Sequence, residues 1–451
     1  MRRVILPAGA ASLGRGFAAF GGLGYQDGMA QAAVRDSRSP RPAPRRRGRT
    51  RGRIRRWLPW VSGGLGVLAA VLWWAVHKFD WMGPMVANGL RAVVGANAVA
   101  KLEDFVYGIE DRVNRVSRGT EAPKAAWSVP PPAAVAAPLA PVPSASAVPG
   151  PPPFRPKDPG PARKAWSAPG DGVWVPIADP RRPGEEPYLY KTLLHPDAER
   201  GWAEVFVVAV DLRRVSVHPM AGTQEPKADN KEAESFERPA VIPEKDHEEL
   251  LAAFNGGFMT EHGGYGFRLN GVTLVGPKPK ACTIAAYQDG TVRVAPWTEL
   301  EADAAKMDWF RQAPECMVHD NKLHPGILYV SGNRKWGATL DGETVIRRSA
   351  IGINQARDTL YVSITNHTNA RILAEGMRHA GAVDVAQLDV NWSYPKFVLF
   401  EPKQPGGPRK AVALASGFEF SEDEYIRKRA RRDFFYLMRK PAAATATPPA
   451  P

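Results

Sequence analysis

The sequence predicts a mixed α+β domain with a largely buried mixed sheet, preceded by one transmembrane helix and a proline-rich linker. Within residues 166–440, short apolar runs are separated by turns that contain Gly or Asn, a pattern typical of strands. Helical spacing of apolar side chains interrupts these runs at 370–380, so helices and strands share one domain. Ahead of the domain, a long uncharged apolar run predicts the helix, and a stretch rich in Pro and Ala predicts the linker.

The net charge is concentrated at the N-terminus. Residues 1–57 contain 14 Arg and no Lys against two Asp, which gives +12 of the chain's formal charge of +14. Residues 77–165 add +4, so residues 166–451 carry −2 and the predicted domain is close to neutral. The Arg-rich arm has few apolar side chains and is predicted to be disordered in the cytoplasm. A neutral domain removes the main argument for a nucleic-acid-binding protein, so no nucleic-acid partner is predicted.

Residues 58–78 are predicted to form the transmembrane helix. The run at 58–76 contains no charged residue, and a helix of that length spans ~28 Å, close to the hydrocarbon thickness of a bilayer. Arg residues crowd its N-terminal side, whereas only Lys78 follows closely. This asymmetry predicts a cytoplasmic N-terminus and a periplasmic or extracellular domain. A cleaved signal peptide is less favoured, because no small-residue cleavage site follows the apolar run closely.

Three further segments flank the domain. Residues 79–119 include a predicted helix at 99–116, whose apolar face lies against the membrane, pairs with a second copy, or has no partner. The sequence leaves the oligomeric state open. Residues 120–165, with 14 of the 43 prolines, are predicted to be an extended linker, and residues 441–451 a disordered tail.

The elements of the domain follow from periodicity and caps. Helices are predicted at 244–252, at 370–380 and from Ser421, where Ser421-Glu-Asp-Glu424 has the form of a capping box that opens a basic C-terminal helix. The first two strands are separated by the turn at 211–214, which predicts a hairpin or tight meander. The predicted strands are 205–210, 215–219, 251–254, 266–269, 272–275, 282–287, 292–295, 316–318, 349–353, 360–364 and 382–388.

The two cysteines, Cys282 and Cys316, lack the spacing of a zinc site. They form a disulfide if the domain is exported, or they fill the core as buried thiols, and the sequence leaves both open. No metal-ligand cluster of specific spacing stands out, so no cofactor is predicted and a bound divalent cation stays open.

Two motifs carry polar groups at the end or start of an apolar strand. Asn255-Gly256-Gly257-Phe258 follows a strand; its glycines permit close approach of the backbone to a ligand, and the Asn255 amide both donates and accepts. Arg348 opens the strand at 349–353, where its planar guanidinium suits an anion such as phosphate. Each motif by itself also fits a turn or a solvated strand end.

A third motif places a carboxylate where an apolar run ends. Asp389 follows the strand at 382–388 and precedes Asn391, Trp392 and Ser393. A charged group at the end of a buried strand needs a reason to be there, and a capped turn is the simplest one. Taken with the other two motifs, Asp389 is instead the predicted catalytic residue.

These motifs resemble those of the phosphodiester glycosidase family. That family carries Asn-Gly-Gly-Phe after a strand, Arg-Thr/Ser-Ala-Ile-Gly, Gly-Ala-x-Asp after a helix, and Leu-Asp-Gly-Gly-Gly-Ser. Here the four motifs stand in the same order at 255–258, 348–352, 381–384 and 388–393, and the resemblance covers about residues 200–400.

The resemblance implies an enzyme that hydrolyses the bond between a sugar's anomeric carbon and a phosphodiester, in an envelope or extracellular glycan. Arg348 would hold the phosphate, and Asp389 would act as base or nucleophile. Substrate would be bound by a further set: Asn255, Gly256, Gly257, Asn391, Trp392 and Ser393. A second acid is not assigned, and its candidates are Glu261, His262, His319 and Asp320.

The chain departs from the family at Val390, Asn391 and Trp392, which stand where the family has glycines. A Trp side chain there either fills space or offers a stacking face for a sugar. The alternative function is therefore a non-catalytic glycan-binding or scaffold module of the cell envelope that uses the same pocket.

Overall fold

The protein's structure, a computed structural model, describes residues 96–129, 153–329, 333–337, 344–404 and 406–441. Within these residues antiparallel sheets predominate over helices, which confirms a mixed α+β domain. The predicted transmembrane segment at 58–78 lies outside the described residues, as do the N-terminal arm and most of the C-terminal tail. No helix in the described ranges is long and apolar enough to cross a membrane.

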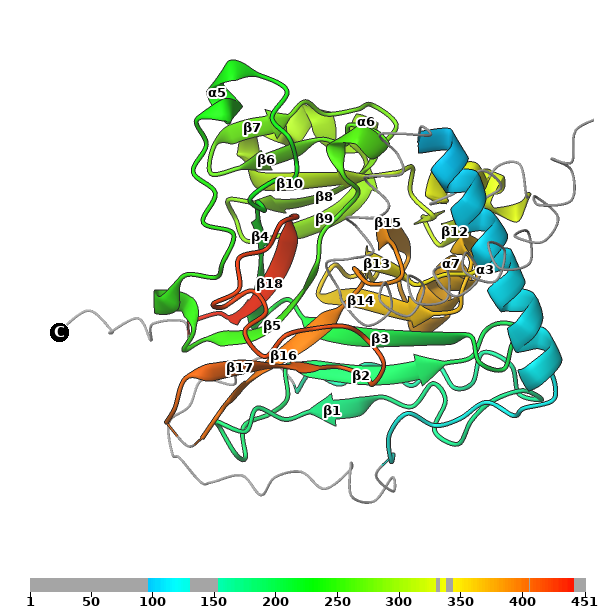
Figure 1. The fold of residues 1–451 in the computed structure, drawn as a ribbon. Coiled ribbons are helices and arrows are strands. Elements are labelled where there is room, and N and C mark those ends of the chain that lie inside the picture. The colour runs from blue at the N-terminus through cyan, green and yellow to red at the C-terminus, as the bar shows by residue number, and fades with distance from the viewer. Residues whose placement is uncertain (1–95, 130–152, 330–332, 338–343, 405, 442–451) are drawn as a thin grey trace, which may run out of the picture. The chain divides into compact units, whose positions relative to one another are not determined.

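An eight-stranded antiparallel sheet, here named the central sheet, organises the domain (Figure 1). Its strands stand in the order β1-β2-β3-β14-β13-β15-β11-β12. β3 and β14 pair over their whole length, from Glu204 opposite Asn366 to Asp211 opposite Thr359. The strands are β1 (Val175–Ile177), β2 (Leu189–Leu194), β3 (Glu204–Asp211), β11 (Val318–His319), β12 (Lys322–Leu323), β13 (Arg348–Ile353), β14 (Thr359–Asn366) and β15 (Asp384–Val390).

Two five-stranded antiparallel sheets complete the described strands. The β5 sheet has the order β17-β16-β5-β18-β4, and the β10 sheet has the order β7-β6-β10-β8-β9. The first contains β4 (Val215–Met220), β5 (Leu250–Asn255), β16 (Phe397–Pro402), β17 (Arg409–Ala413) and β18 (Phe434–Arg439). The second contains β6 (Phe267–Leu269), β7 (Val272–Val275), β8 (Cys282–Tyr287), β9 (Val292–Pro296) and β10 (Met307–Ala313).

The helices are few and mostly short. α3 (Ala96–Arg118) precedes the domain, and α7 (Ala370–Ala380) packs on the central sheet. The remaining helical turns are α5 (Lys231–Glu234), α6 (Trp297–Leu300), η1 (Glu244–Asp246), η2 (Thr260–His262), η3 (Glu301–Lys306), η4 (Pro325–Leu328) and η5 (Asn333–Trp336).

Strand β3 shows why the central strands have continuous apolar sequences. Val205 and Val207 pack with α7, whereas Phe206 and Val208 pack in a core shared with both five-stranded sheets. Successive side chains of a strand point to opposite faces, and here both faces are buried. The strand predicted at 205–210 is therefore confirmed.

Helix α7 has the bounds that the sequence predicts. The Asn369 side chain accepts a hydrogen bond from the Ile372 N–H at 2.9 Å and caps the N-terminus. Gly381, with φ of 114°, ends the helix in the left-handed region that favours glycine. Local signals suffice at this helix because both of its ends are capped by its own sequence.

The prediction of a hairpin across the turn at 211–214 is wrong. β3 belongs to the central sheet, whereas β4 pairs with β18 in the β5 sheet. The Asp211 carboxylate accepts hydrogen bonds from Arg213 and Arg214 at 2.8 and 3.0 Å, which fixes a tight turn. The turn itself is local, but the partner of the second strand comes from the C-terminal end of the domain.

Two predicted helices are replaced by strands. At 244–252 only η1 forms, and β5 then begins at Leu250 because it pairs with β16 and β18. After Ser421 one bond of the capping box forms, since the Ser421 N–H donates to Glu424 Oε2 at 3.2 Å. Tyr425 then takes a φ of 64°, which stops a helix, and the chain proceeds into β18.

Two aromatic residues inside the predicted linker pack against the domain. The Trp127 ring lies 5.9 Å from the Phe206 ring, and the Phe154 ring lies 5.7 Å from the Tyr190 ring. The folded part of the chain thus includes residues from both ends of the segment at 120–165.

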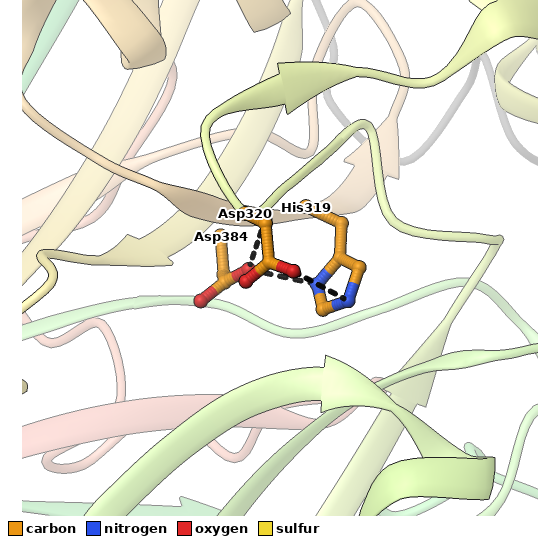
Figure 2. A group of neighbouring side chains, drawn as sticks. All are labelled: His319, Asp320 and Asp384. Atoms are coloured by element: carbon orange, nitrogen blue, oxygen red, sulfur yellow. Dashed lines mark hydrogen bonds and ion pairs between the residues drawn. The ribbon is translucent and has the colours of Figure 1, made fainter.

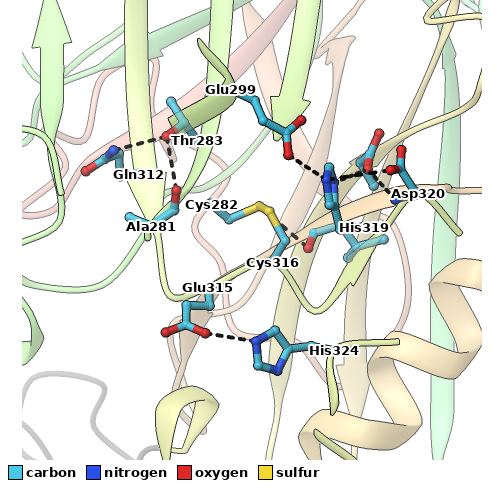
Figure 3. The surroundings of a disulfide bond; sticks show 12 residues. Ala281, Cys282, Thr283, Glu299, Gln312, Glu315, Cys316, His319, Asp320 and His324 are labelled. Atoms are coloured by element: carbon cyan, nitrogen blue, oxygen red, sulfur yellow. Dashed lines mark hydrogen bonds and ion pairs between the residues drawn. A yellow bond between two sulfur atoms is a disulfide. The ribbon is translucent and has the colours of Figure 1, made fainter. Parts of the chain in front are cut away.

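Cys282 and Cys316 form a disulfide with a Cα–Cα distance of 4.7 Å (Figure 3). Cys282 begins β8, and Cys316 lies just ahead of β11, so the bond ties the β10 sheet to the edge of the central sheet. Of the two states that the sequence leaves open, the structure contains the disulfide. Disulfides form and persist mainly in oxidising compartments.

Loss of this disulfide is expected to lower the free energy of unfolding by about 2–4 kcal/mol, because the bond closes a long loop in the unfolded chain. The measurement is urea unfolding of the Cys282→Ser/Cys316→Ser variant beside the parent protein with and without reductant. Reduced parent protein should match the variant. Equal stability of all three samples would contradict the prediction.

Candidate functional site

The three sequence motifs meet in one hydrogen-bonded chain. The Asn255 Nδ2 donates to Ser349 Oγ at 2.7 Å, and Ser349 Oγ donates to the Asp389 carbonyl at 3.0 Å. The Asp389 N–H in turn donates to the Gly256 carbonyl at 3.2 Å. All of these side chains are buried. The ends of β5 and β15 and the start of β13 are thereby held together, and Asp389 lies where they converge.

The Asp389 carboxylate forms an ion pair with Arg432. Its Oδ2 contacts Arg432 Nη1, and its Oδ1 accepts a hydrogen bond from the Val390 N–H at 2.9 Å. Burial raises the pKa of Asp389, while Arg432 and the Val390 N–H oppose that change. The Asp389 side chain is 4% exposed and the Arg432 side chain 24% exposed, so the guanidinium lies between a buried carboxylate and solvent.

The Tyr394 ring and a second ion pair help to position Arg432. Its guanidinium lies 4.5 Å from the centre of the Tyr394 ring, and the Tyr394 hydroxyl donates to the Asp433 carbonyl at 2.8 Å. The Asp433 side chain accepts from Arg311 Nε at 2.8 Å, and both groups are almost fully buried. Arg432 is thus positioned by a strand start that is itself anchored in the core.

The Arg311 and Asp433 pair also fixes the glycine motif. Gly257 N–H donates to Asp433 Oδ2 at 3.1 Å, and Gly256 N–H donates to the Asp433 carbonyl at 2.9 Å. A Cβ at Gly256 would lie 2.2 Å from Asp433 Oδ2, and a Cβ at Gly257 would lie 2.9 Å from Arg311 Nη2. The glycines are explained by this close packing, and both amides, predicted to bind substrate, donate within the protein.

Arg348 lies away from the Asp389 carboxylate. The register of β13 and β15 shifts so that the single residue Ser349 stands between the pairs Arg348–Val390 and Ala350–Gln387. This bulge places two residues of β15 opposite one of β13, which re-aims the side chains around it. Gln387 contacts Arg348, whereas Asp389 contacts Arg432.

The Arg348 guanidinium is fully buried and its donors are used by the protein. It donates to the carbonyls of Trp336, Thr344 and Thr368 and to the side chain of Gln387. These bonds connect β13 to the segments that flank it. These contacts engage the Arg348 guanidinium inside the protein, and none of the four is with the Asp389 side chain.

The residues that follow Asp389 form a turn. Asn391 Oδ1 accepts from the Ser393 N–H at 3.0 Å and contacts Ser393 Oγ at 3.2 Å, as in an Asx turn. The Trp392 ring lies 4.3 Å below the Arg347 guanidinium and 5.5 Å from the His367 ring. The predicted binding residues Asn391, Trp392 and Ser393 therefore lie beside Asp389, with Trp392 half-buried against an Arg.

Sequence reasoning missed Arg311, Tyr394, Arg432 and Asp433. Three of them come from regions read as turn or helix, and Arg311 lies inside an apolar strand. One signal was available: Asp433 stands immediately before the apolar run of β18, as Asp389 stands at the end of β15. Carboxylates at the boundaries of buried strands mark both positions.

Among the candidates for a second acid, His262 is the one that acts electrostatically on Asp389: it opposes the rise in the Asp389 pKa that burial causes. The His262 side chain is 48% exposed. Glu261 is similarly exposed and pairs with Lys227 at 3.4 Å. His319 and Asp320 belong to a different cluster at the edge of the central sheet.

That cluster is built around an ion-paired histidine. His319 Nδ1 lies 2.8 Å from Asp384 Oδ1, and His319 Nε2 lies 2.8 Å from Glu299 Oε1 (Figures 2 and 3). His319, Asp320 and Asp384 also form a group whose ligand atoms lie within 4.8 Å of one another, in the part of the chain that the structure describes. Both ring nitrogens face a carboxylate, so the geometry fits an imidazolium better than a metal ligand, which needs an unprotonated nitrogen.

His319 is expected to stabilise the fold at low pH. Burial lowers its pKa, but the Asp384 hydrogen bond and the charges of Glu299 and Asp320 outweigh burial and raise it above 6.5. The stabilisation is therefore fully present below pH 6.5 and is lost as the pH rises through the raised value. The measurement is the difference in unfolding free energy between the parent protein and His319→Gln across neutral pH.

In the Asp384→Asn background the same difference should depend less on pH, because the hydrogen-bonded carboxylate is gone. A difference that grows with rising pH would contradict the assignment.

Comparisons with known proteins give a weak structural likeness. No family model matches the chain, and no curated protein matches it. A solved structure of the zebrafish N-acetylglucosamine-1-phosphodiester alpha-N-acetylglucosaminidase catalytic domain, auto-inhibited by its pro-peptide, is similar with 15% identity and a TM-score of 0.37, over 59% of this chain and 88% of that one. A hypothetical protein from Synechocystis is similar with 10% identity and a TM-score of 0.33, over 57% of this chain and 65% of that one. At these scores the likeness assigns neither a family nor a function.

Proposed function

We propose that the domain is a hydrolase that cleaves the bond between a sugar's anomeric carbon and a phosphodiester. The observation that carries the proposal is the ion pair between buried Asp389 and partly exposed Arg432, at the point where the sequence motifs converge. Arg432 takes the anion-binding role that the sequence had given to Arg348. Asn255 and Ser349 hold the backbone of Asp389 rather than contacting substrate.

The chemistry needs one cation and one carboxylate. A phosphodiester oxygen that reaches Arg432 competes with Asp389 for the guanidinium, whose planar donors suit phosphate. Asp389 Oδ2 is then released to take a proton from water as that water attacks the anomeric carbon. The bond between the anomeric carbon and the phosphodiester oxygen breaks. The phosphate leaves as a monoester anion, and free sugar forms. Arg432 stabilises the charge that develops on the leaving group.

The site of action is proposed to be outside the cytoplasm, with the protein anchored by residues 58–78. Two observations support this proposal: the disulfide between Cys282 and Cys316, and the Arg-rich sequence ahead of the apolar run. A reporter enzyme fused to the C-terminus should be active only if that end lies outside the cytoplasm. Activity of a cytoplasmic reporter would overturn the proposal.

The catalytic proposal is tested with full-length protein and a panel of sugar-1-phosphodiesters. Free sugar and phosphomonoester should appear in equal amounts. Arg432→Gln should lower kcat/KM by roughly 100-fold, because a charged donor to the leaving phosphate is lost. Arg431→Gln is the matched control, since Arg431 is the exposed neighbour and loses the same charge. Equal loss in both variants would contradict a specific role for Arg432.

One observation favours the glycan-binding module as a second candidate. Both Asp389 oxygens already have protein partners, and Val390, Asn391 and Trp392 close the turn that follows. The module would be supported in place of the hydrolase if the protein binds the sugar-1-phosphodiesters without releasing sugar. In that case Asp389→Asn should bind them with the same affinity as the parent protein.

A further inference from the structure

Helix α3 carries an apolar face that is exposed. Phe105 is 65% exposed, Val113 58% and Val116 89%, and Val106 and Ile109 are each nearly half exposed. Most of the exposed large apolar side chains among the described residues lie on α3. Contiguous exposed apolar side chains on a soluble surface mark a contact site. We name Phe105, Val106, Ile109, Val113 and Val116 the α3 stripe.

The opposite face of α3 is already used by the protein's own domain. Asp111 accepts hydrogen bonds from Arg200 Nε and Nη2 at 2.7 and 2.9 Å, and Arg115 pairs with Glu199 at 2.9 Å. Tyr107 packs against the cluster of Phe258 and Val390. At about 100° per residue, the α3 stripe spans an arc of about 100° centred opposite Asp111. The stripe therefore faces away from the domain.

The stripe continues a heptad pattern in the sequence. Valines at 99, 106 and 113 fill one heptad position, and Leu102, Ile109 and Val116 fill the other, with alternating spacings of three and four. Such spacing is typical of a two-helix seam. Val at the first position occurs in parallel two-stranded coiled coils.

The charge of α3 argues for a helix partner over a lipid surface. The helix has four basic residues, Lys101, Arg112, Arg115 and Arg118, and four acidic residues, so its net charge is zero. Helices that lie on anionic membranes carry an excess of Lys and Arg on the polar face, which α3 lacks.

The chain ahead of α3 also sets the direction of pairing. The helix begins at Ala96, only a short stretch after the apolar segment at 58–78. If residues 58–78 anchor the chain as proposed above, two copies in one membrane present α3 in the same direction. Confinement raises the local concentration of the partner helix, which compensates for the modest length of the seam.

We propose that the α3 stripe forms a parallel coiled coil with the α3 stripe of a second copy of this chain. Each domain then lies on the outer side of the pair, because Asp111, Arg115 and Tyr107 bind it on the opposite face of α3. The proposal does not depend on the catalytic function, since none of the stripe residues contacts Asp389 or Arg432.

Cysteine crosslinking in the full-length, membrane-bound protein tests both pairing and direction. Cys282 and Cys316 are bonded to each other, so an introduced cysteine is the free thiol. Val116→Cys should form a symmetric dimer on mild oxidation, whereas Gly108→Cys, exposed on the same helix but off the stripe, should not. A mixed crosslink between Leu102→Cys and Val116→Cys in place of the symmetric one would indicate antiparallel pairing and overturn the proposal.

Association is measured independently by the mass of the full-length protein in detergent. Ile109→Glu should weaken dimer formation by roughly 100-fold, because a carboxylate is forced into an apolar seam. Gly108→Glu adds the same charge outside the seam and should leave the dimer intact. A parent protein that is monomeric, or a dimer unaffected by Ile109→Glu, would overturn the proposal.

Discussion

Asp433→Ala is expected to lower the free energy of unfolding by about 3–5 kcal/mol, since it leaves the Arg311 guanidinium buried without its counter-charge. Both side chains are nearly inaccessible, with Arg311 Nε 2.8 Å from Asp433 Oδ2. The change also removes the acceptor of the Gly257 N–H. The measurement is urea unfolding of the full-length protein followed by tryptophan fluorescence.

Asp423→Ala is the matched control for this prediction. Asp423 pairs with Arg427 on the surface, where both side chains are about half exposed, so its loss should change stability by at most about 1 kcal/mol. The variant Arg311→Met/Asp433→Ala should recover part of the stability, because no unpaired buried charge remains. A similar loss of unfolding free energy in Asp433→Ala and Asp423→Ala would show that the buried pair contributes no more to stability than the exposed pair.

Asp389→Asn is expected to lower kcat for sugar release by roughly 10²–10⁴-fold, the range over which a positioned acid or base accelerates a reaction. The amide keeps the shape of the side chain but can neither take a proton from water nor act as a nucleophile. Asp308→Asn is the control, since Asp308 is exposed on β10 and undergoes the same chemical change. Folding of both variants is checked by their thermal unfolding, so that lost activity is separated from lost structure.

The pH dependence of kcat/KM gives a second readout for the same residue. Burial raises the pKa of Asp389 above its usual range, so activity that needs the ionised form should fall on the acidic side at a higher pH than for an ordinary Asp. Arg432 opposes that rise, and Arg432→Gln should therefore move the acidic limb to still higher pH. An acidic limb that stays in place in Arg432→Gln would contradict the coupling of Asp389 and Arg432.

The candidate site was predicted in part. The sequence brought together Asn255 and Asp389 through a family resemblance, and the structure connects them through Ser349. It also selected Arg348, whose position at a strand start looks the same whether the side chain points to a ligand or into the core. Strand alternation and the bulge opposite Ser349 decide that question, and a bulge leaves no reliable mark in sequence.

The C-terminal strand shows a second limit of local reasoning. At Ser421 the N–H donates to the Glu424 side chain as the capping box predicts, and the hydroxyl accepts from the Asp423 N–H, but the chain does not become a helix. β18 pairs with β5 on one side and β4 on the other, and these long-range ladders outweigh a local helical preference. The same pairing delivers Arg432 and Asp433 to the candidate site from a distant part of the chain.

By itself the sequence determined the features that depend on neighbours along the chain. These are the α+β class, most of the strands as apolar runs, the helix at 370–380 that forms α7, and the carboxylate at the end of β15. Only the tertiary structure decided which strands pair, which face of β13 carries Arg348, that Cys282 meets Cys316, and that Arg432 meets Asp389. The reason is physical: caps and periodicity act within a few residues, whereas sheet pairing and buried ion pairs join residues that are far apart in sequence.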